Sequence, residues 1–363
     1  MSVEEFLPQE YSESVKNGSF KWQSPSNIAL VKYWGKKPKQ IPANPSVSFT
    51  LDHCKTLTRL DFQKKNSGED FEFEVFFEGR KKDDFKPKIN TFFKRIESYC
   101  PFLKDYSFKI YSENTFPHSS GIASSASGMS ALALCMMSLE KELNPEMSEG
   151  FFNRKASFLA RLGSGSACRS IKGEMVVWGE HENIKGSSDL YGIVYPDEVH
   201  EIFRNYQDTI LLVDKGKKEV SSSVGHDLMH GHPFADVRFK QAETNLTNLK
   251  PVFAEGNLEE FIKIVENEAL SLHAMMMSSM PYFILMKPNT LKIINKIWDF
   301  RRETSLPVCF TLDAGANVHV LYPEKNKNEI FEFIKNELVA CCENGQYICD
   351  QLGSGAKQLS MEN

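Results

Sequence analysis

Apolar and polar positions along the chain follow two different periods, one typical of strands and one typical of helices. Phe71, Phe73 and Val75 alternate with glutamates, which is the two-residue period of a half-buried strand. Apolar residues from Lys88 onwards recur every three to four positions, so they share one helical face and predict a helix. Three prolines within 38–45 exclude a helix there.

The same reasoning predicts elements along the rest of the chain. We expect further strands at 27–33, 47–51, 107–115, 174–178, 209–214, 308–312 and 318–322. We expect further helices at 129–143, 151–162, 234–254, 257–274, 288–303 and 327–342. A chain of 363 residues exceeds one small module. We therefore predict an aperiodic polar leader, ordered only where something holds it, and two larger parts, with boundaries 1–19, 20–206 and 207–363.

Composition narrows the class of protein. The chain is 41% hydrophobic and 25% charged, which excludes a mainly disordered, collagen-like or coiled-coil architecture. The 43 basic and 48 acidic residues leave a net charge of -5, which argues against a nucleic acid or an anionic membrane as partner. The longest apolar run, 131–137, is too short to span a bilayer.

The cysteines and the N-terminal segment predict an intracellular protein. Eight cysteines in a chain of this length are too dilute for a disulfide scaffold, and the sequence has no CxxC pair. The first residues have neither the basic nor the apolar region of a secretory signal. We therefore expect free thiols and a cytoplasmic protein.

The small-residue segment 117–128 lies between a predicted strand and a predicted helix. The N–H groups of a helix's first turn have no partner within the helix, and the helix dipole favours an anion there. Gly121 and Gly128 allow close approach of the backbone, and Ser124 and Ser125 add hydroxyl donors. The segment is neither a Walker A loop nor GxGxxG. Its residues alone indicate either a phosphate site or a tightly packed loop.

Three cations are further candidates. Arg169 ends a second small-residue turn, 163–170, and offers a planar fork suited to carboxylate or phosphate, although a surface arginine after a helix end is the more common case. Lys32 and Lys36 are four residues apart, so in an extended strand both lie on one face. Such a pair more commonly marks a solvated edge.

Other reactive side chains have ordinary explanations as well. Asp313 lies where a predicted hairpin turns, which is a normal place for aspartate. His273 follows an apolar helical face and is expected in the core or at its rim. The methionines at 275–277 are expected to fill the core or line a pocket. No HExxH, paired Cys/His cluster or EF-hand loop occurs, so a dedicated metal cage is not expected.

Taken together and in this order, five segments resemble the diphosphomevalonate decarboxylase family of the GHMP small-molecule kinase superfamily. The resemblance covers most of residues 22–323. Its segments are SPSNIALVKYWGK (24–36), NPSVSFTL (44–51), PHSSGIASSASG (117–128), GSGSACRS (163–170) and DAGANVHV (313–320). It implies an α/β (α+β) fold with an N-terminal half like ribosomal protein S5 domain 2, a ferredoxin-like C-terminal half and the active site in the cleft between them.

The resemblance also implies a reaction. ATP phosphorylates the 3-hydroxyl of mevalonate 5-diphosphate, and loss of phosphate and carbon dioxide gives isopentenyl diphosphate, in the mevalonate route of isoprenoid biosynthesis. Asp313 matches the catalytic aspartate, Arg169 the residue that holds the substrate carboxylate, and Lys32 a residue near the reacting centre. A carboxylate with a pKa of about 4 is a poor base for an alcohol, so Asp313 is expected to act late, as charge develops.

The implied binding residues fall into two groups. Tyr33 and Lys36 match residues that hold the substrate diphosphate, and the full expected substrate set is Tyr33, Lys36, Ser164, Ser166, Arg169 and Ser222. The expected nucleotide set is Pro117, Ser120, Gly121, Ala123, Ser124, Ser125 and Ser127. Mg²⁺ would be bound mainly through ATP phosphates and water, with Ser124 as the candidate protein ligand. ATP and Mg²⁺ are thus the expected cofactors, the partners are small molecules, and the family habit is a homodimer.

Four positions depart from the family pattern. Pro45 stands where a serine is usual, Ile122 where a leucine is usual, and Ala316 where a proline is frequent; His226 stands where the family often has methionine, and this position bears on the substrate phosphate contacts. Two alternatives stay open at this point. One is a sister enzyme, a 3-kinase or decarboxylase, that takes mevalonate or its 5-phosphate. The other is a non-catalytic ligand sensor on the same fold.

Overall fold

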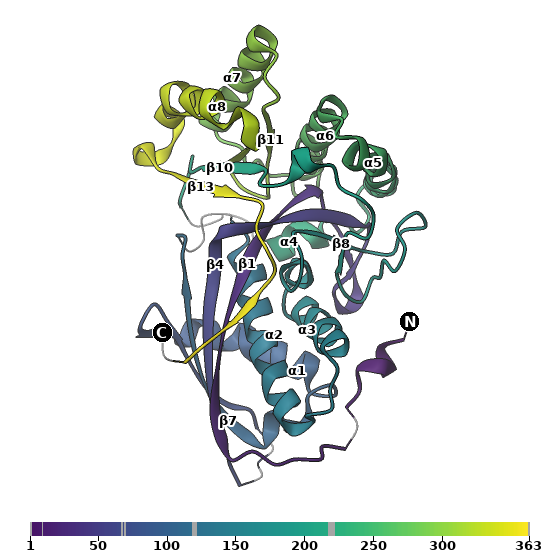
Figure 1. Cartoon of the computed structure of the whole chain (residues 1–363), viewed down its shortest axis with the longest axis vertical. Helices are drawn as coiled ribbons and strands as arrows, with labels where there is room; N and C mark the ends of the chain where they lie inside the picture. Colours follow the sequence, from purple (N-terminus) through teal and green to yellow (C-terminus); the bar gives the residue numbers. More distant parts are fainter. Residues whose placement is uncertain are drawn as a thin grey trace.

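The computed structural model describes residues 2–8, 10–66, 68, 70–117, 122–216 and 222–361, with the side chains of 222 and 223 excepted. Its two larger β-sheets, each with its own helices, are arranged one above the other along the long axis of the molecule (Figure 1). Long strands of the lower sheet reach up to the upper part. This arrangement agrees with the expected two-part α/β fold.

The lower sheet has eight strands, in the order β14-β1-β4-β7-β5-β6, with β8 paired to β4 and β9 to β8. Neighbours are antiparallel except β5 and β7, which are parallel. The strands are β1 (Asn17–Val31), β4 (Ser46–Lys64), β5 (Glu72–Phe77), β6 (Arg80–Lys81), β7 (Tyr106–Asn114), β8 (Met175–Trp178), β9 (Ile193–Val194) and β14 (Lys357–Leu359). A short hairpin of β2 (Lys36–Lys37) and β3 (Ile41–Pro42) follows β1.

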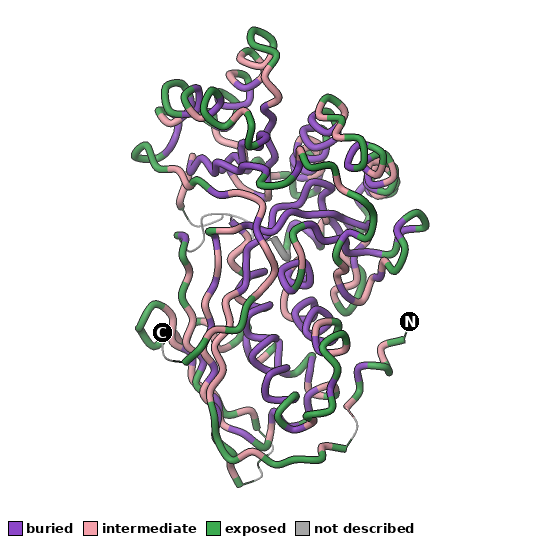
Figure 2. Tube along the Cα trace, viewed as in Figure 1, coloured by how far each residue is buried: buried purple, intermediate pink, exposed green. Residues whose placement is uncertain are grey.

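Helices cover one face of this sheet. They are α1 (Lys86–Ile96), α2 (Ser124–Leu143) and α3 (Glu149–Gly163). The helix α2 packs on β1 and β4, α3 packs beside α2, and α1 packs against α3. The apolar run 131–137 explains this central place, because a helix that is apolar on all sides has to be buried. Figure 2 shows the buried residues concentrated along α2 and at the crossing of the long strands.

The upper sheet has four antiparallel strands in the order β11-β12-β10-β13. These are β10 (Gln207–Leu211), β11 (Cys309–Thr311), β12 (Val318–Tyr322) and β13 (Tyr347–Gln351). The helices of this part are α4 (Ser222–Asp227), α5 (Ala235–Glu255), α6 (Leu258–Met277), α7 (Pro288–Thr304) and α8 (Lys327–Phe333). The helix α6 packs on β11 of its own sheet and also on β1, so it joins the two parts.

The predicted elements are confirmed, but several of their bounds are wrong. β1 and β4 are much longer than the predicted strands at 27–33 and 47–51, and α2 starts at Ser124 rather than at 129. The inner side of β4 carries Thr56 and Thr58, both buried and hydrogen-bonded, so polar residues concealed its alternation. The predicted helix 327–342 ends its α-helical part at Phe333 and continues as a π turn and a 3-10 turn.

The C-terminal segment crosses from the upper part back to the lower one (Figure 1). The strand β14 pairs with β1, so residues 357–359 lie in the first sheet although the sequence placed them with 207–363. The buried carboxylate of Asp350 accepts hydrogen bonds from the backbone N–H groups of Asp52, His53 and Cys54, at 2.8, 2.8 and 2.7 Å. This segment therefore ties the two parts together, and the boundary near 206 stays a prediction.

A buried aromatic side chain helps to hold the N-terminal leader. Phe6 ends a 3-10 turn, Val3–Phe6, and is completely buried. Its ring stacks on Phe158 of α3 at 4.3 Å between centroids and meets Tyr191 edge-on at 6.1 Å. We predicted that the leader is ordered only where something holds it, and the contacts of Phe6 hold it. The last residues of the predicted leader, from Asn17, belong to β1.

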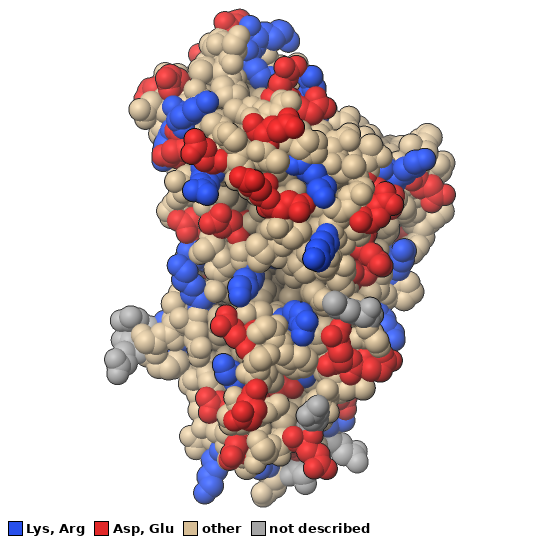
Figure 3. Space-filling view, turned by 45° about the vertical axis from the view of Figure 1, so that its right-hand side comes forward, with Lys and Arg blue, Asp and Glu red and all other residues tan. Residues whose placement is uncertain are grey.

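The surface carries mixed charge. Figure 3 shows lysines and arginines interspersed with aspartates and glutamates over the visible face, without an extended field of one sign. This pattern matches the net charge of -5. Of the helices formed by the described residues, none is long and apolar enough to cross a membrane.

Replacing Phe6 by alanine should lower the free energy of unfolding by about 3–5 kcal/mol, the usual cost of removing a buried phenylalanine ring. Urea unfolding followed by circular dichroism measures the change. Leu7→Ala is the matched control, because Leu7 is 46% exposed and its truncation should cost little. Equal losses for the two variants would contradict the proposed anchoring of the leader.

Candidate active site

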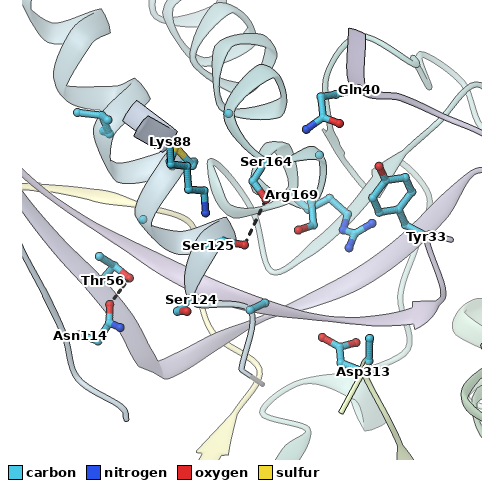
Figure 4. Close-up of a pocket in the computed structure, with 18 of the residues that line it drawn as sticks. Tyr33, Gln40, Thr56, Lys88, Asn114, Ser124, Ser125, Ser164, Arg169 and Asp313 are labelled. Atoms are coloured by element: carbon cyan, nitrogen blue, oxygen red, sulfur yellow. Dashed lines mark hydrogen bonds between the residues drawn. The ribbon is translucent and has the colours of Figure 1, made fainter. Parts of the chain in front are cut away.

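A cavity of about 550 Å³ opens between the two parts of the molecule. Its walls include the end of β1, the start of α2, the turn after α3 and the loop between β11 and β12 (Figure 4). His226 of the helix α4 also lines it. Most of the candidate residues therefore meet in one place. Those that line it are Lys32, Tyr33, Lys36, Ala123, Ser124, Ser125, Ser164, Ser166, Arg169 and Asp313.

The segment after β1 places Lys32 at the junction of the two parts. The Lys32 ammonium lies 3.2 Å from Oδ1 of Asp313, which comes from the upper part. The backbone of Lys32 is fixed on both sides, because its N–H donates to Oε2 of Glu268 at 2.8 Å and its carbonyl accepts from the Asn44 amide at 2.9 Å. The Lys32 side chain is buried, whereas that of Asp313 is 28% exposed.

Burial lowers the pKa of Lys32, and the Asp313 carboxylate opposes this shift most strongly. Glu268 also raises the pKa of Lys32, while Arg169 lowers it. The charged state of this lysine therefore depends on nearby carboxylates. The imidazole of His273 donates through Nε2 to the Asp313 carbonyl at 3.1 Å, and burial lowers the pKa of His273 to about 4. The expectation of a core or rim histidine is met, and this histidine braces the turn that carries Asp313.

Glu268 is held by its own buried network. Its carboxylate forms a two-pronged pair with Arg238 of α5 and accepts from the Asn245 amide at 2.6 Å. Removing one partner of a buried ion pair is strongly destabilising, because the other charge is left uncompensated. The pair therefore fixes α5 and α6 to each other, and through Glu268 it also fixes Lys32.

The small-residue loop ends at the first turn of α2. Ala123 precedes the helix with a positive φ of 44°, and Ser124 and Ser125 occupy the first helical positions. Oγ of Ser125 lies 3.3 Å from Oγ of Ser164, so the loop and the turn after α3 face each other in the cavity (Figure 4). The N-terminus of a helix is a favourable place for an anion.

Two residues predicted to bind the nucleotide, Ser127 and Pro117, do not line the cavity. Ser127 is buried and bonded to Oγ1 of Thr56 at 2.6 Å, so it packs α2 on the sheet and does not line the cavity. Pro117 is exposed and likewise lies outside the cavity lining. Ser120 and Gly121 fall outside the described residues, so their predicted roles stay predictions.

Arg169 is almost completely buried, yet it lines the cavity. Its Nη1 donates to Oγ of Ser46 at 2.5 Å and its Nε donates to Oδ1 of Asn27 at 3.3 Å. Burial lowers the pKa of Arg169, and these partners are neutral. A buried guanidinium with neutral partners is suited to receive a ligand carboxylate or phosphate. The alternative of a surface arginine at a helix end is wrong.

Tyr33 and Lys36 form another wall of the cavity. The Lys36 ammonium lies 3.3 Å from Oδ1 of Asp227 in α4. Burial raises the pKa of the Tyr33 hydroxyl, so Tyr33 is a neutral donor. Ser222 begins α4, but its side chain is not described and its role stays a prediction.

Several cavity residues were not found from the sequence. Lys88 is exposed as a whole residue, but its amine points into the cavity (Figure 4), and desolvation lowers its pKa. Lys88 lies next to the apolar face of α1, and this position in the sequence could have marked it as a lysine close to a buried surface. Asn114 ends β7 directly before the loop and accepts from Thr56 at 2.8 Å. Gln40 comes from the β2–β3 hairpin, and nothing in its sequence context marks it.

The donor set of the cavity also limits how a metal ion could be held. Among the described residues, no three His, Cys, Asp or Glu side chains cluster as metal ligands. The oxygen donors near the α2 end are the hydroxyls of Ser124 and Ser125 and, across the cavity, the Asp313 carboxylate. Hard oxygen donors in this number fit an ion that takes its other ligands from phosphate and water, as Mg²⁺ commonly does.

The two-part fold, with a cleft that presents cations and a helix N-terminus, places the molecule in the class of GHMP-type small-molecule kinase folds. Residues 24–190 match the model of the diphosphomevalonate decarboxylase-like N-terminal domain. Residues 209–362 match the model of the mevalonate 5-diphosphate decarboxylase C-terminal domain. The chain belongs to the diphosphomevalonate decarboxylase family.

Individual relatives agree with this assignment. The diphosphomevalonate decarboxylase of Debaryomyces hansenii is 30% identical over 329 residues, which cover 86% of this chain and 81% of the relative. The crystal structure of mevalonate diphosphate decarboxylase from Staphylococcus aureus is similar with a TM-score of 0.79 and 28% identity, covering 95% of this chain and 98% of that one. The structure of MDDEF in complex with MVAPP, AMPPCP and magnesium is similar with a TM-score of 0.79 and 28% sequence identity. The match covers 94% of this chain and 99% of that chain.

The Glu268 network generates a prediction about pH. Glu268→Gln removes a charge that raises the pKa of Lys32, so the Lys32 ammonium should lose its proton at lower pH than in the parent protein. The alkaline limb of kcat/KM should shift to lower pH accordingly. Pre-steady-state or steady-state rates from neutral to alkaline pH measure this shift.

Glu266→Gln is the matched control, because Glu266 lies on the same helix and pairs with Arg301 instead. Both variants should lose stability, since each leaves an arginine without its carboxylate. Only Glu268→Gln should move the alkaline limb. An unchanged limb in that variant would show that Glu268 does not act on Lys32.

Proposed function

We propose that this chain is an ATP-dependent decarboxylase that converts mevalonate 5-diphosphate into isopentenyl diphosphate, ADP, phosphate and carbon dioxide. The observation that carries the proposal is the meeting of Asp313, Lys32 and Arg169 on one cavity that also contains the N-terminal end of α2. The curated relative and the solved structures are diphosphomevalonate decarboxylases, and MDDEF was solved with MVAPP, AMPPCP and magnesium.

The nucleotide is proposed to enter from the α2 side. The helix N-terminus with Ser124 and Ser125 would receive phosphate oxygens. Beyond it the cavity wall turns apolar, with Val75, Phe77 and Ile110, and suits the faces of a purine. Lys88 stands at this end as an additional cation. Mg²⁺ would be held by Ser124 and by phosphate oxygens, and when bound it neutralises charge on the transferring phosphoryl group.

The phosphoryl transfer is assigned to the junction of the two parts. The carboxylate of Asp313 orients the 3-hydroxyl of the substrate toward the γ-phosphate and accepts its proton as the new O–P bond forms. The Lys32 ammonium, 3.2 Å from Oδ1, holds this carboxylate and lies beside the charge that develops. The bond between the γ-phosphorus and the bridging oxygen of ATP breaks, and ADP leaves.

The decarboxylation is assigned to Arg169. Its guanidinium would hold the substrate carboxylate in a fixed plane, which orients the bond to be broken. The bond between C3 and its phosphorylated oxygen breaks, and the electron pair of the bond between the carboxylate carbon and C2 becomes the new double bond. Phosphate and carbon dioxide leave, so atoms and charge balance.

The proposal is tested by measuring release of ADP and isopentenyl diphosphate with mevalonate, its 5-phosphate and its 5-diphosphate. Turnover to isopentenyl diphosphate is expected with the diphosphate only. Turnover of the 5-phosphate alone would identify a sister enzyme, and binding without turnover of any of the three would identify a sensor. Either outcome contradicts the proposal.

The role of Asp313 is tested in the same assay. Asp313→Asn should lower kcat by roughly two to four orders of magnitude, the usual contribution of a positioned acid–base group, while the Kd of the substrate stays within about threefold. Asp299→Asn is the control, because Asp299 pairs with Arg302 on the exposed side of α7. Unchanged turnover of Asp313→Asn would leave Asp313 as a turn residue.

We further propose a cytoplasmic homodimer. All eight cysteines are free thiols, which suits a reducing compartment. The start of α5 and the segment after α6 carry exposed apolar residues, a feature typical of an interface. They are Phe234, Val237, Met277, Met280, Tyr282 and Ile284.

If this apolar surface forms the dimer interface, one charge introduced into it should weaken the dimer. Val237 is 72% exposed, so Val237→Asp should fold normally but dissociate the dimer, because a carboxylate would be buried in the interface. Sedimentation velocity gives the mass of both proteins. A monomeric parent protein would contradict the dimer, and an equally dimeric variant would place the interface elsewhere.

A further inference from the structure

His226 occupies a slot between two aromatic rings at the wall of the cavity. Its ring lies 4.2 Å from that of Tyr33 and 4.6 Å from that of Trp34, between centroids. The preceding residue makes this close approach possible, because a Cβ added to Gly225 would lie 2.5 Å from the Trp34 ring. Only a glycine lets α4 approach this closely, so the imidazole is firmly placed.

The backbone determines which ring nitrogen carries the proton. The N–H of Gly35 donates to Nδ1 of His226 at 3.0 Å, so Nδ1 must be unprotonated. In the neutral ring the proton then resides on Nε2. Burial, with Lys36 and Arg169 as nearby cations, lowers the pKa of His226 to about 3. The side chain is thus a neutral group with one N–H donor.

Among the residues that the structure describes, none accepts a hydrogen bond from this donor. His226 is only 9% exposed, and Nε2 makes no hydrogen bond with any residue that the structure describes. Nε2 is nevertheless not sealed from solvent, unlike the buried unpaired polar atoms elsewhere in the molecule. His226 is one of the residues that line the cavity, so the cavity is the open space next to its ring. Buried donors are nearly always satisfied, so a ligand atom is the natural acceptor.

The neighbours of this donor indicate an anion. The Lys36 ammonium is on the same wall and pairs with Asp227, the residue that follows His226. The Tyr33 hydroxyl belongs to the ring on which His226 stacks. The imidazole N–H, the phenol and the ammonium are three hydrogen-bond donors, and only the ammonium is charged. Such a set of donors suits the oxygens of a phosphate group.

We propose that His226 is a substrate-binding residue that donates a hydrogen bond from Nε2 to a phosphate oxygen of the diphosphate, alongside Tyr33 and Lys36. The inference rests on the proposed function, because it takes mevalonate 5-diphosphate as the ligand. A methionine at this position, as the family often has, cannot donate this bond. The chain would therefore recognise the phosphate end of its substrate by a contact of its own.

The experiment uses two variants of the full chain. His226→Phe keeps an aromatic ring in the slot without a donor, and His226→Met introduces a thioether. Both should raise the KM for mevalonate 5-diphosphate by roughly tenfold or more, the usual effect of losing a hydrogen bond to a charged group, with kcat within about threefold and the KM for ATP unchanged. His230→Phe, an exposed histidine one turn further on, is the control and should bind as the parent does.

A second measurement on the parent protein does not depend on any variant folding. With ¹⁵N-labelled histidine, Nε2 of His226 should give a protonated signal and Nδ1 an unprotonated one, and the Nε2 proton should move downfield on saturation with mevalonate 5-diphosphate. Unmoved His226 signals, or a His226→Phe variant with the parent's KM, would overturn the inference while the parent still turns over. A parent protein that neither binds nor turns over the diphosphate would instead defeat the proposed function.

Discussion

The structure depends most on how one buried ammonium is held at the junction of the two parts. Lys32 belongs to the lower part, whereas Asp313 and Glu268 belong to the upper part. A lysine removed from water loses its charge readily unless carboxylates lie close to it. Each part therefore lacks a complete site without the other, and the contact that joins them also opposes the lowering of the Lys32 pKa by burial. The Asp350 carboxylate of the C-terminal segment, which accepts hydrogen bonds from the backbone of Asp52 and Cys54, also holds the two parts together.

The cavity gathers basic side chains although the chain as a whole is slightly acidic. The chain has a net charge of -5, yet its cavity gathers Lys32, Lys36, Lys88 and Arg169. Burial lowers the pKa of Arg169 and of Lys32, and the nearby Asp313 carboxylate opposes this shift in both. A small, highly charged anion would add counter-charge beside these cations. The cavity can therefore select a polyanion of limited size while the outer surface attracts none.

Sequence patterns predicted most of the residues that line the cavity, but not the buried residues that hold them in place. Lys32, Arg169 and Asp313 all line the cavity, as their motifs indicated. Glu268 was missed, because a glutamate on an amphipathic helix is normally solvated and only the packing of α6 on β1 makes it buried. Ser127 was placed in the nucleotide site because it lies in the loop motif, but the helix turns its hydroxyl toward the sheet. Strand lengths were underestimated for a related reason, since buried threonines conceal alternation.

The sequence by itself determined the local preferences and the chemical groups. Small residues before a helix indicated a candidate anion site, apolar periods predicted the succession of strands and helices, and the order of the motifs indicated the family. Only the tertiary structure decided which groups meet and in what state. The pairing of Lys32 with Asp313, and the tautomer of His226 set by the Gly35 N–H, join residues far apart in the chain. Such contacts depend on the packing of two sheets and on the water excluded between them, and no local pattern records either.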